Sequence, residues 1–214
     1  MYSSDDEIPT LALHLKVATA QMHRRVERST FMSRLLRGEI DCAGYVGLLH
    51  NLQALYLALE HALQRHAECA ELAPVVLPEL FRGRAIEHDL RALAAPPIAA
   101  LCDATQHYVE RLGELDRRAP GLLVAHAYVR YLGDLNGGQV LQRIVSRALG
   151  LQGRVGTAFY DFGDTAARQA LATRFRAGLA ALDALAPDRD AIVAEAVDAF
   201  RRHERMFEQL LPAG

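Results

Sequence analysis

Apolar residues recur at intervals of three and four positions through most of the chain, the spacing that places them on one face of an α-helix. The first predicted helix begins after Thr10, a suitable N-cap residue, and ends at about Arg28. Its apolar stripe is formed by Leu11, Leu15, Ala18, Met22 and Val26. A longer helix is expected to follow Asp41, another N-cap residue, and to continue through Leu63. We expect only a short turn over residues 31–38 between the two.

Prolines divide the rest of the chain, because proline lacks the backbone N–H group that a helix interior needs. Pro74 and Pro78 precede one predicted helix, Pro97 and Pro120 each open another, and Pro187 separates the last two. These helices are expected over about 79–93, 97–115, 120–150, 165–185 and 188–211, with the longest loop at 151–164. No internal repeat or interdomain linker interrupts the pattern. The sequence therefore predicts an all-α fold, with a flexible N-terminus at residues 1–10 and one helical domain at residues 11–211.

Composition and charge narrow the class of protein. The chain has 214 residues, 51% of them hydrophobic, and a net charge of −2, which argues against a nucleic-acid partner. No apolar run approaches the ~18 residues of a membrane-spanning helix, and the polar start MYSSDDEIPT is unlike a signal peptide. Cys42, Cys69 and Cys102 are far apart and form no C-x-x-C pair, which favours buried, reduced thiols. We therefore expect a cytoplasmic protein that does not associate with membranes.

The stretch from Val124 to Ile144, VAHAYVRYLGDLNGGQVLQRI, is helical in pattern at both ends, but glycines interrupt its middle. Each glycine in a helix interior costs about 1 kcal/mol relative to alanine, so Gly133, Gly137 and Gly138 together cost about 3 kcal/mol. A soluble domain is stable by only ~5–15 kcal/mol in total. The pattern predicts a helix that bends, or a backbone that a flat, bulky ligand approaches closely.

His23 is the candidate metal ligand, because Glu27 follows it four residues later on the same helix face. A metal-ligating histidine commonly donates its second ring N–H to a carboxylate. Taken alone, the pair is a weak signal and is more typical of a solvated helix face. Other metal and nucleophile classes lack their motifs: no glutamate has a histidine three residues later, as di-iron bundles require, and H-E-x-x-H and G-x-S-x-G are absent.

Two segments resemble the haem oxygenase family. The stretch Lys16-Val17-Ala18-Thr19, with His23 and Glu27 after it, is similar to the first helix of that family. The residues from Ala125 to Gln139, AHAYVRYLGDLNGGQ, resemble its distal helix almost residue for residue. The similarity extends from about Leu11 to Leu211.

The resemblance implies a multi-helix bundle that holds haem between the first helix and the glycine-kinked helix. The implied reaction opens haem b, both cofactor and substrate, to biliverdin, carbon monoxide and ferrous iron. Dioxygen is the co-substrate, and a reductase or ferredoxin supplies electrons. A protein that accepts biliverdin is a further candidate partner.

The resemblance also assigns roles on the proximal side of the haem. It implies that His23 ligates the haem iron and that Glu27 orients its imidazole. Lys16, Tyr128 and Arg176 correspond to positions that contact the haem propionates; solvated surface groups are the alternative. Because Lys16 is present, we expect the ring to open at its α-meso edge.

On the distal side, Gly133, Gly137 and Gly138 correspond to glycines that let the helix lie against the haem face. Asp134 corresponds to the carboxylate that organises water for proton delivery to dioxygen. Arg130 resembles a neighbour that joins this network or pairs with Asp134. The alternative for Asp134 is a carboxylate on the helix surface.

Other positions carry weaker expectations. Met32 and Phe207 either line the haem pocket or are ordinary core residues. The resemblance gives His126 no iron to bind, so a structural role is expected, and His107 and His203 are expected in the surface or core. Two positions depart from the family. Asn136 stands where serine is common, and Ala20 stands where some relatives have a second basic residue, which weakens propionate anchoring.

Two other functions are compatible with a helical haem-sized pocket. A haem carrier or storage protein would keep the fold without turnover, but it would not need Asp134 between the glycines. A relative of the thiaminase type shares the general fold, but it gives no reason for the pairing of His23 with Glu27.

Overall fold

The computed structural model describes residues 10–98, 100–185 and 188–211, and all regular secondary structure in these ranges is helical. The α-helices are α1 (Leu11–Glu27), α2 (Thr30–Leu36), α3 (Cys42–Arg65), α4 (Gly83–Ala92), α5 (Asp103–Arg118), α6 (Leu123–Ala148), α7 (Thr165–Ala181) and α8 (Arg189–Gln209). Short 3-10 turns occur at Ala73–Val75, Pro78–Leu80, Pro120–Leu122, Ala158–Tyr160 and Leu182–Ala184. The predicted all-α fold is confirmed, whereas residues 1–9 and Pro187 lie outside the described ranges.

The two predicted N-caps are present. The Thr10 side chain accepts a hydrogen bond from the Leu13 backbone N–H group at the start of α1, and Asp41 accepts one from Gly44 at the start of α3. A side-chain acceptor at this position satisfies a backbone N–H group that the helix itself leaves unpaired. Local sequence therefore determines where these two helices begin.

The prediction of a turn over residues 31–38 is wrong, because residues 30–36 form the short helix α2. Ser29 caps it by accepting a hydrogen bond from the Met32 backbone N–H group. Phe31 and Leu35, four residues apart, are buried against the core. Burial of this face stabilises a helix too short to be stable alone.

Two other predicted helix starts are also wrong. The helix expected from Pro97 begins at Asp103, where Asn51 accepts a hydrogen bond from the Cys102 backbone N–H group. The helix expected from residue 79 begins at Gly83, where the Glu60 carboxylate accepts from the backbone. Both starts are fixed by side chains of α3, so a local pattern of prolines does not reveal them.

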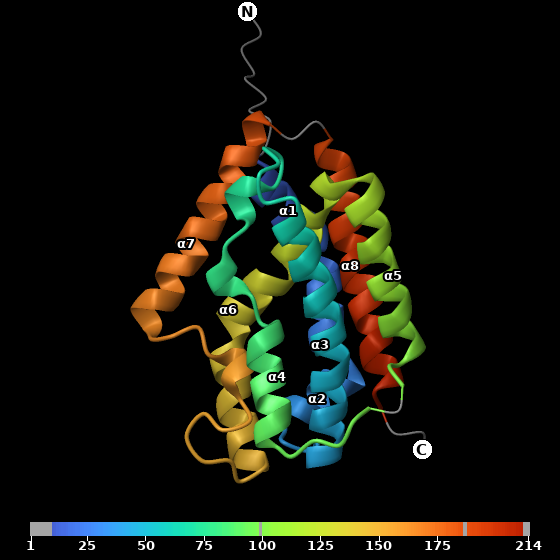
Figure 1. Cartoon of the computed structure of the whole chain (residues 1–214), viewed down its shortest axis with the longest axis vertical. Coiled ribbons are helices and arrows are strands. Elements are labelled where there is room, and N and C mark those ends of the chain that lie inside the picture. The colour runs from blue at the N-terminus through green and yellow to red at the C-terminus, as the bar shows by residue number, and fades with distance from the viewer. Residues whose placement is uncertain (1–9, 99, 186–187, 212–214) are drawn as a thin grey trace, which may run out of the picture.

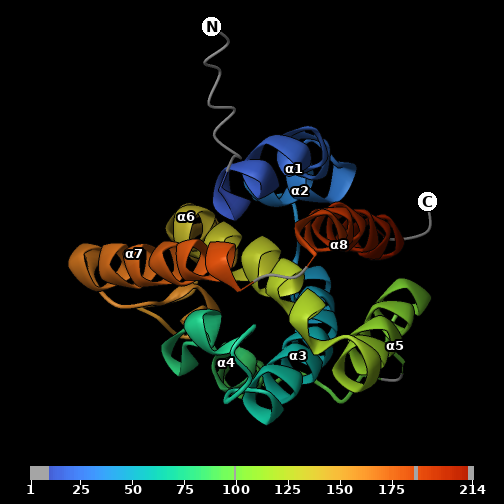
Figure 2. The ribbon, with the colours of Figure 1, turned by 90° about the horizontal axis from the view of Figure 1, so that it is seen from above.

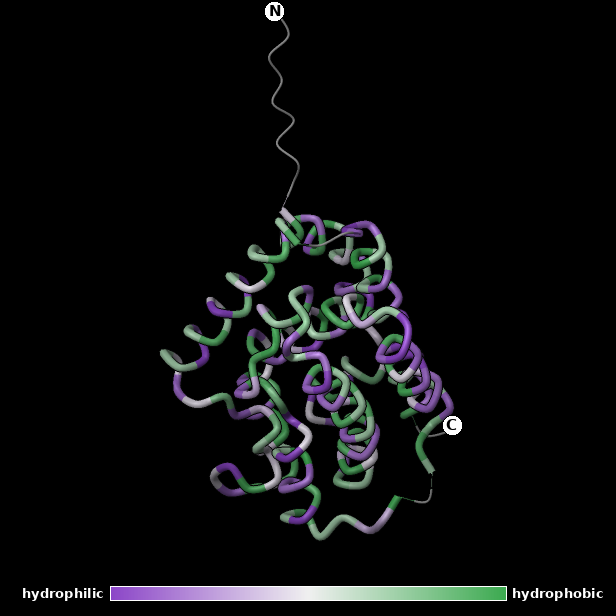
Figure 3. Tube along the Cα trace, turned by 45° about the horizontal axis from the view of Figure 1, so that its top comes forward, coloured by the Kyte–Doolittle hydropathy of each residue, from purple (hydrophilic) through white to green (hydrophobic). Residues whose placement is uncertain are grey.

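The helices form three layers. Seen from above, α7, α6 and α8 form a middle row, with α1 and α2 on one side and α3, α4 and α5 on the other (Figure 2). Hydrophilic and hydrophobic segments alternate along the helices in Figure 3, as expected for helices with one face in the core. The largest fully buried side chains include Tyr45, Tyr56, Tyr108 and Tyr131.

Helix α6 continues through its three glycines without leaving the helical conformation, since none of them has a positive φ angle. Its axis changes direction near the middle, so that its two halves point differently (Figure 1). The expected bend is therefore present, and it occurs inside one continuous helix. This geometry leaves Gly133 exposed and buries Gly138.

Helix α7 lies close to the 3-10 turn at Ala73–Val75. A Cβ atom added to Gly178 would collide with the Pro74 carbonyl oxygen. The backbones of α7 and this turn therefore touch at a point where only glycine fits.

The expectation of buried thiols is wrong for Cys42, which is exposed, while Cys69 and Cys102 are partly exposed. All three are free cysteines. Of the helices in the described ranges, none combines the length and the apolar character needed to cross a membrane.

Candidate functional site

An ion pair lies in the glycine-rich part of α6. The Arg130 Nη2 atom is 3.1 Å from Asp134 Oδ1, and the two side chains are 10% and 9% exposed. The residues are four positions apart and so share one helix face. Asp134 is therefore a buried, paired carboxylate, and it does not lie free on the helix surface.

Tyr56 of α3 completes the environment of this pair. Its hydroxyl group donates a hydrogen bond to Asp134 Oδ2 and accepts one from Arg130 Nε at 2.9 Å. Sequence reasoning did not find Tyr56, because it lies 78 positions from Asp134 and sits within an ordinary apolar stripe.

His203 of α8 contacts the same guanidinium group. Arg130 Nη1 lies 3.0 Å from His203 Nε2, and the His203 ring meets the edge of Phe207 with centroids 4.4 Å apart. His203 is only 5% exposed. His203 is therefore a core residue, one of the two placements expected for it, and its contacts place it beside the candidate site.

Burial controls the charges of this cluster. It raises the pKa of Asp134, although Arg130 and the Tyr56 hydroxyl group favour the ionised form. It lowers the pKa of His203 well below the usual value, and the charge of Arg130 adds to this effect, so the imidazole is neutral. Burial also opposes the charge of Arg130, but Tyr56 and Asp134 outweigh it and raise its pKa. The cluster thus contains Arg130 as a permanent cation and the Asp134 carboxyl group with a raised pKa.

A cavity of about 60 Å³ adjoins the cluster. Its lining includes six of the predicted site residues, namely Met32, Arg130, Gly133, Asp134, Gly138 and Phe207. A polar cavity can hold a water molecule when roughly 10–15 Å³ is open to its centre. This cavity therefore has room for several water molecules beside Asp134.

The glycines of α6 face two environments. A Cβ atom added to Gly133 or Gly137 would meet nothing within 4 Å, whereas one added to Gly138 would lie 3.5 Å from the Tyr160 carbonyl oxygen. A side chain at position 138 would therefore make ordinary van der Waals contact with the 3-10 turn at Ala158–Tyr160, so this packing does not require glycine. Gly133 and Gly137 instead leave an open backbone surface on α6.

His23 and Glu27 form the expected pair on α1. His23 Nδ1 lies 3.4 Å from Glu27 Oε2, and the side chains are 51% and 57% exposed. The imidazole also meets the edge of the Phe200 ring, with centroids 5.8 Å apart. Among the described residues, His23 Nε2 has no hydrogen-bond partner, so it is free to bind a ligand.

The three residues expected at the propionates differ in burial. Lys16 on α1 and Arg176 on α7 are exposed, and neither makes an ion pair within the described ranges. Tyr128 on α6 is partly buried, which raises its pKa, while a hydrogen bond with Thr19 of α1 opposes the change. The two cations are therefore available to an anion, and Tyr128 links α6 with α1.

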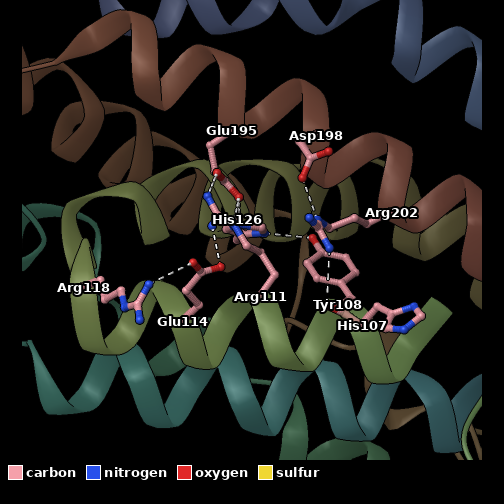
Figure 4. Close-up of polar contacts among 9 residues, drawn as sticks. All are labelled: His107, Tyr108, Arg111, Glu114, Arg118, His126, Glu195, Asp198 and Arg202. Atoms are coloured by element: carbon pink, nitrogen blue, oxygen red, sulfur yellow. Dashed lines mark hydrogen bonds and ion pairs between the residues drawn. The ribbon is translucent and has the colours of Figure 1, made fainter. Parts of the chain in front are cut away.

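A second buried polar cluster lies one turn before Arg130 on α6 (Figure 4). His126 contacts the Tyr108 hydroxyl group of α5 and the Glu195 carboxylate of α8, each at 3.0 Å. Arg111 of α5 holds the other Glu195 oxygen at 2.7 Å. Burial would raise the Glu195 pKa, but His126 and Arg111 outweigh it and lower the pKa to about 2. His126 is thus fully paired, in agreement with its expected structural role.

A larger hollow of about 530 Å³ lies between α1, α2 and α8. Its lining includes Arg24, Arg28 and Phe31, and of the predicted site residues it contains Phe207. Its walls offer neither His23 nor the Asp134 cluster. We therefore place the candidate site at the smaller cavity and the open faces of α1 and α6.

The chain was compared with known families, sequences and structures. The family model described as "Heme oxygenase" matches residues 9–209. Heme oxygenase 1 of Homo sapiens is 37% identical over 211 residues, which cover 96% of this chain and 73% of the relative. Heme oxygenase of Rhodella violacea is 34% identical over 203 residues, with 94% and 86% covered.

Solved structures agree with these matches. Heme oxygenase-1 of Synechocystis, solved in complex with heme, superimposes with a TM-score of 0.86 at 34% identity and covers 94% of this chain and 92% of its own. Heme oxygenase of Leptospira interrogans gives a TM-score of 0.86 at 31% identity, with 93% and 98% covered. The family model, the relatives and the fold together show that the chain belongs to the haem oxygenase family, the enzymes that cleave haem to biliverdin, carbon monoxide and iron.

Proposed function

We propose that this chain binds haem b between α1 and α6, with His23 as the iron ligand, and opens it to the α isomer of biliverdin. The observation that carries the proposal is the pair of open surfaces. His23 presents a free Nε2 atom on α1, and Gly133 and Gly137 present backbone without side chains on α6. A Cβ atom on either glycine would enter the space that a flat ring system needs.

Haem, when bound, is the substrate and supplies the iron at which dioxygen is activated. Glu27 fixes the orientation of the His23 imidazole through Nδ1, which leaves Nε2 for the iron. Lys16, Arg176 and the Tyr128 hydroxyl group hold the two propionates and so set the rotation of the ring. Because Lys16 is present, product chromatography is expected to give the α isomer, and a β or δ isomer would contradict this placement.

On the distal side, Asp134 holds water in the adjoining cavity and supplies protons through it. Each carboxylate oxygen has one protein partner, Arg130 or Tyr56, and a carboxylate oxygen can accept a second hydrogen bond. The paired side chain cannot rotate freely, so the remaining lone pairs keep a fixed direction. Dioxygen is the co-substrate, a reductase or ferredoxin is the electron donor, and a biliverdin acceptor is a candidate downstream partner.

The His23 assignment is tested by His23→Ala. Loss of the imidazole should change the Soret band of the bound haem and weaken haem affinity, and added imidazole should restore the spectrum. His61→Ala on the exposed side of α3 is the control and should leave both unchanged. A spectrum of His23→Ala identical to that of the wild type would place the ligand elsewhere.

The Asp134 assignment is tested by Asp134→Asn, which keeps the size of the side chain. Haem affinity should be retained, while biliverdin formation should fall by roughly 100-fold or more, the range of lost proton-transfer catalysis. Asp198→Asn, which removes an ion pair on α8, should turn over normally. Normal turnover by Asp134→Asn would remove Asp134 from the mechanism. If the wild-type protein, given reductant and air, retained its Soret band without forming biliverdin, the carrier function would be favoured.

A further inference from the structure

The hollow between α1, α2 and α8 is distinct from the cavity beside Asp134, and the proposed function does not use it. Its volume of about 530 Å³ lies within the range of small-molecule pockets, about 300–1,000 Å³. Phe207 lines both spaces, so the hollow is a close neighbour of the candidate site. A compound that leaves the candidate site is therefore released near this hollow.

One wall of the hollow presents guanidinium groups. Arg24, Arg25 and Arg28 of α1 line it, and all three are exposed. Arg25 Nε donates to Glu204 Oε1 of α8 at 2.5 Å, whereas the guanidinium groups of Arg24 and Arg28 have no polar partner among the described residues. Arg24 and Arg28 are four positions apart on one helix face, and each can bind a carboxylate with paired hydrogen bonds. This wall therefore fits a ligand that carries two carboxylates.

A second wall presents hydrogen-bond acceptors. Glu204 and Glu208 of α8 line the hollow and share one helix face. Glu204 has an oxygen on Arg25, and in the part of the chain that the structure describes Glu208 has no ion-pair partner. An ionised carboxylate only accepts hydrogen bonds. A ligand that reaches this wall must therefore offer N–H or O–H donors, because a simple anion would be repelled from it.

Aromatic rings form the apolar part of the lining. The rings of Phe31 on α2 and Phe207 on α8 are stacked, with centroids 5.0 Å apart and planes inclined by 16°. Leu211 adds further apolar surface. Flat conjugated ring systems pack favourably on aromatic faces. The hollow thus combines two free guanidinium groups, carboxylate acceptors and a flat apolar surface.

We propose that this hollow binds biliverdin, the product of the haem oxygenase reaction, outside the haem site. Biliverdin has two propionates for Arg24 and Arg28, ring N–H groups for Glu208, and conjugated rings for Phe31 and Phe207. Haem carries the same propionates, but its ring nitrogens all bind the iron and have no N–H group to donate. The lining therefore favours the linear tetrapyrrole over the closed ring. The inference rests on the proposed function, because an active enzyme supplies the biliverdin.

The test measures the binding of added biliverdin to protein whose haem site is already filled. The ferric haem complex is prepared without a reductant, so that no turnover occurs, and biliverdin is added by equilibrium dialysis. One equivalent should bind while the Soret band of the haem is retained. A second equivalent of haem, added in place of biliverdin, should bind at least about tenfold more weakly, since it lacks the N–H donors. Absence of biliverdin binding, or displacement of one haem for each biliverdin bound, would overturn the inference.

A double variant assigns the binding to the guanidinium wall. Arg24→Gln combined with Arg28→Gln should weaken biliverdin binding about tenfold or more, because each substitution removes a charge-assisted hydrogen bond. The matched control, Arg84→Gln with Arg147→Gln, removes two exposed arginines on α4 and α6 and should leave the binding unchanged. Equal losses in the two double variants would show that the overall charge of the protein, and not the hollow, attracts biliverdin.

Glu208→Ala separates recognition of the N–H groups from attraction by charge alone. If the guanidinium groups merely attracted a dianion, removal of a nearby negative charge would strengthen binding. A bilin that donates to this carboxylate should instead bind several-fold more weakly. Unchanged or tighter binding by Glu208→Ala, or a second haem bound as tightly as biliverdin, would contradict the assignment. Every measurement uses added biliverdin, so failure of the proposed function, seen as loss of turnover, is distinguishable from failure of this site.

Discussion

The Glu60 carboxyl group is buried between α3 and the start of α4. It accepts hydrogen bonds from the backbone N–H groups of Arg82 and Gly83, the latter at 3.1 Å, and so replaces a local N-cap for α4. Burial raises its pKa to about 7, although these two hydrogen bonds favour the ionised form. Glu60 therefore changes its charge near neutral pH within the folded protein.

Replacing Glu60 by glutamine should alter how stability depends on pH. The folded state holds the Glu60 proton up to about pH 7, whereas an unfolded glutamate loses it near pH ~4.3, so this residue makes the wild type less stable as pH rises between those values. Glu60→Gln removes this term. Its unfolding free energy relative to the wild type should therefore rise by up to roughly 3–4 kcal/mol across the window and stay constant above it.

Urea unfolding at intervals from pH 4.5 to 8.5 would measure this difference. The exposed Glu68→Gln is the control and should give a flat difference. A flat difference for Glu60→Gln as well would show that Glu60 ionises in the folded protein as it does in water.

For single residues, spacing along the sequence predicts contacts within one helix, but it does not predict contacts between helices. The pairing of Arg130 with Asp134 and that of His23 with Glu27 follow from a separation of four residues. Tyr56 and His203 reach Arg130 from 74 and 73 positions away. The periodic pattern of apolar residues does not reveal such contacts, because they depend on how whole helices pack.

Among the elements, α6 must remain a continuous helix and also leave part of its backbone uncovered. Its glycines weaken it as a helix, yet Gly133 and Gly137 keep a backbone surface open. The sequence indicated the bend, because glycine in a helix interior is unfavourable without a reason. It did not indicate α2 or the start of α5, since those depend on burial of Phe31 and on an acceptor from Asn51.

The open surface predicts opposite effects of Gly137→Ala on stability and on haem binding. Nothing in the structure opposes the added Cβ atom, so the unfolding free energy should rise by up to about 1 kcal/mol. Haem affinity should fall by about tenfold or more, because an extra methyl group in a filled site costs about 1–3 kcal/mol. Thermal unfolding without haem and haem titration would measure the two quantities.

Gly47→Ala provides a matched control. Gly47 is a helical glycine of α3 whose added Cβ atom also meets nothing within 4 Å. It should raise stability similarly and leave haem affinity unchanged. If Gly137→Ala behaved like Gly47→Ala in both measurements, the haem would not lie against this part of α6.

Across the whole molecule, two buried polar clusters join the layers at neighbouring turns of α6. One links Arg130 with Tyr56 of α3 and His203 of α8, and the other links His126 with Glu195 of α8 and with α5 (Figure 4). Helix α6 is thus connected to α3 and to α8 by polar contacts as well as by apolar packing.

The Glu195 cluster predicts how the fold responds to acid. The folded pKa of about 2 lies below the unfolded value near ~4.3, so the contribution of Glu195 to stability is complete above about pH 4.5 and is lost as the pH falls toward 2. Glu195→Gln should therefore be less stable than the wild type by roughly 3 kcal/mol at pH 6, with a difference that shrinks in acid.

Denaturant unfolding between pH 3 and 6 would follow this difference. Glu114→Gln removes the other partner of Arg111. The Glu114 side chain is 43% exposed, so its loss should change the unfolding free energy much less than Glu195→Gln does. A difference between Glu195→Gln and the wild type that stayed constant down to pH 3 would mean that Glu195 is not held ionised by its neighbours.

The contact between Gly178 and the Pro74 carbonyl oxygen has a consequence for propionate binding. In its proposed role, Arg176 must be held at a fixed position relative to the rest of the fold. That position depends on Gly178, two residues later, where α7 rests on the turn at Ala73–Val75. Outward side chains of α7 other than Arg176 can vary without disturbing this contact, but a side chain at position 178 requires the helix or the turn to shift. Under the same placement, propionate binding therefore also depends on a glycine that is buried beneath α7.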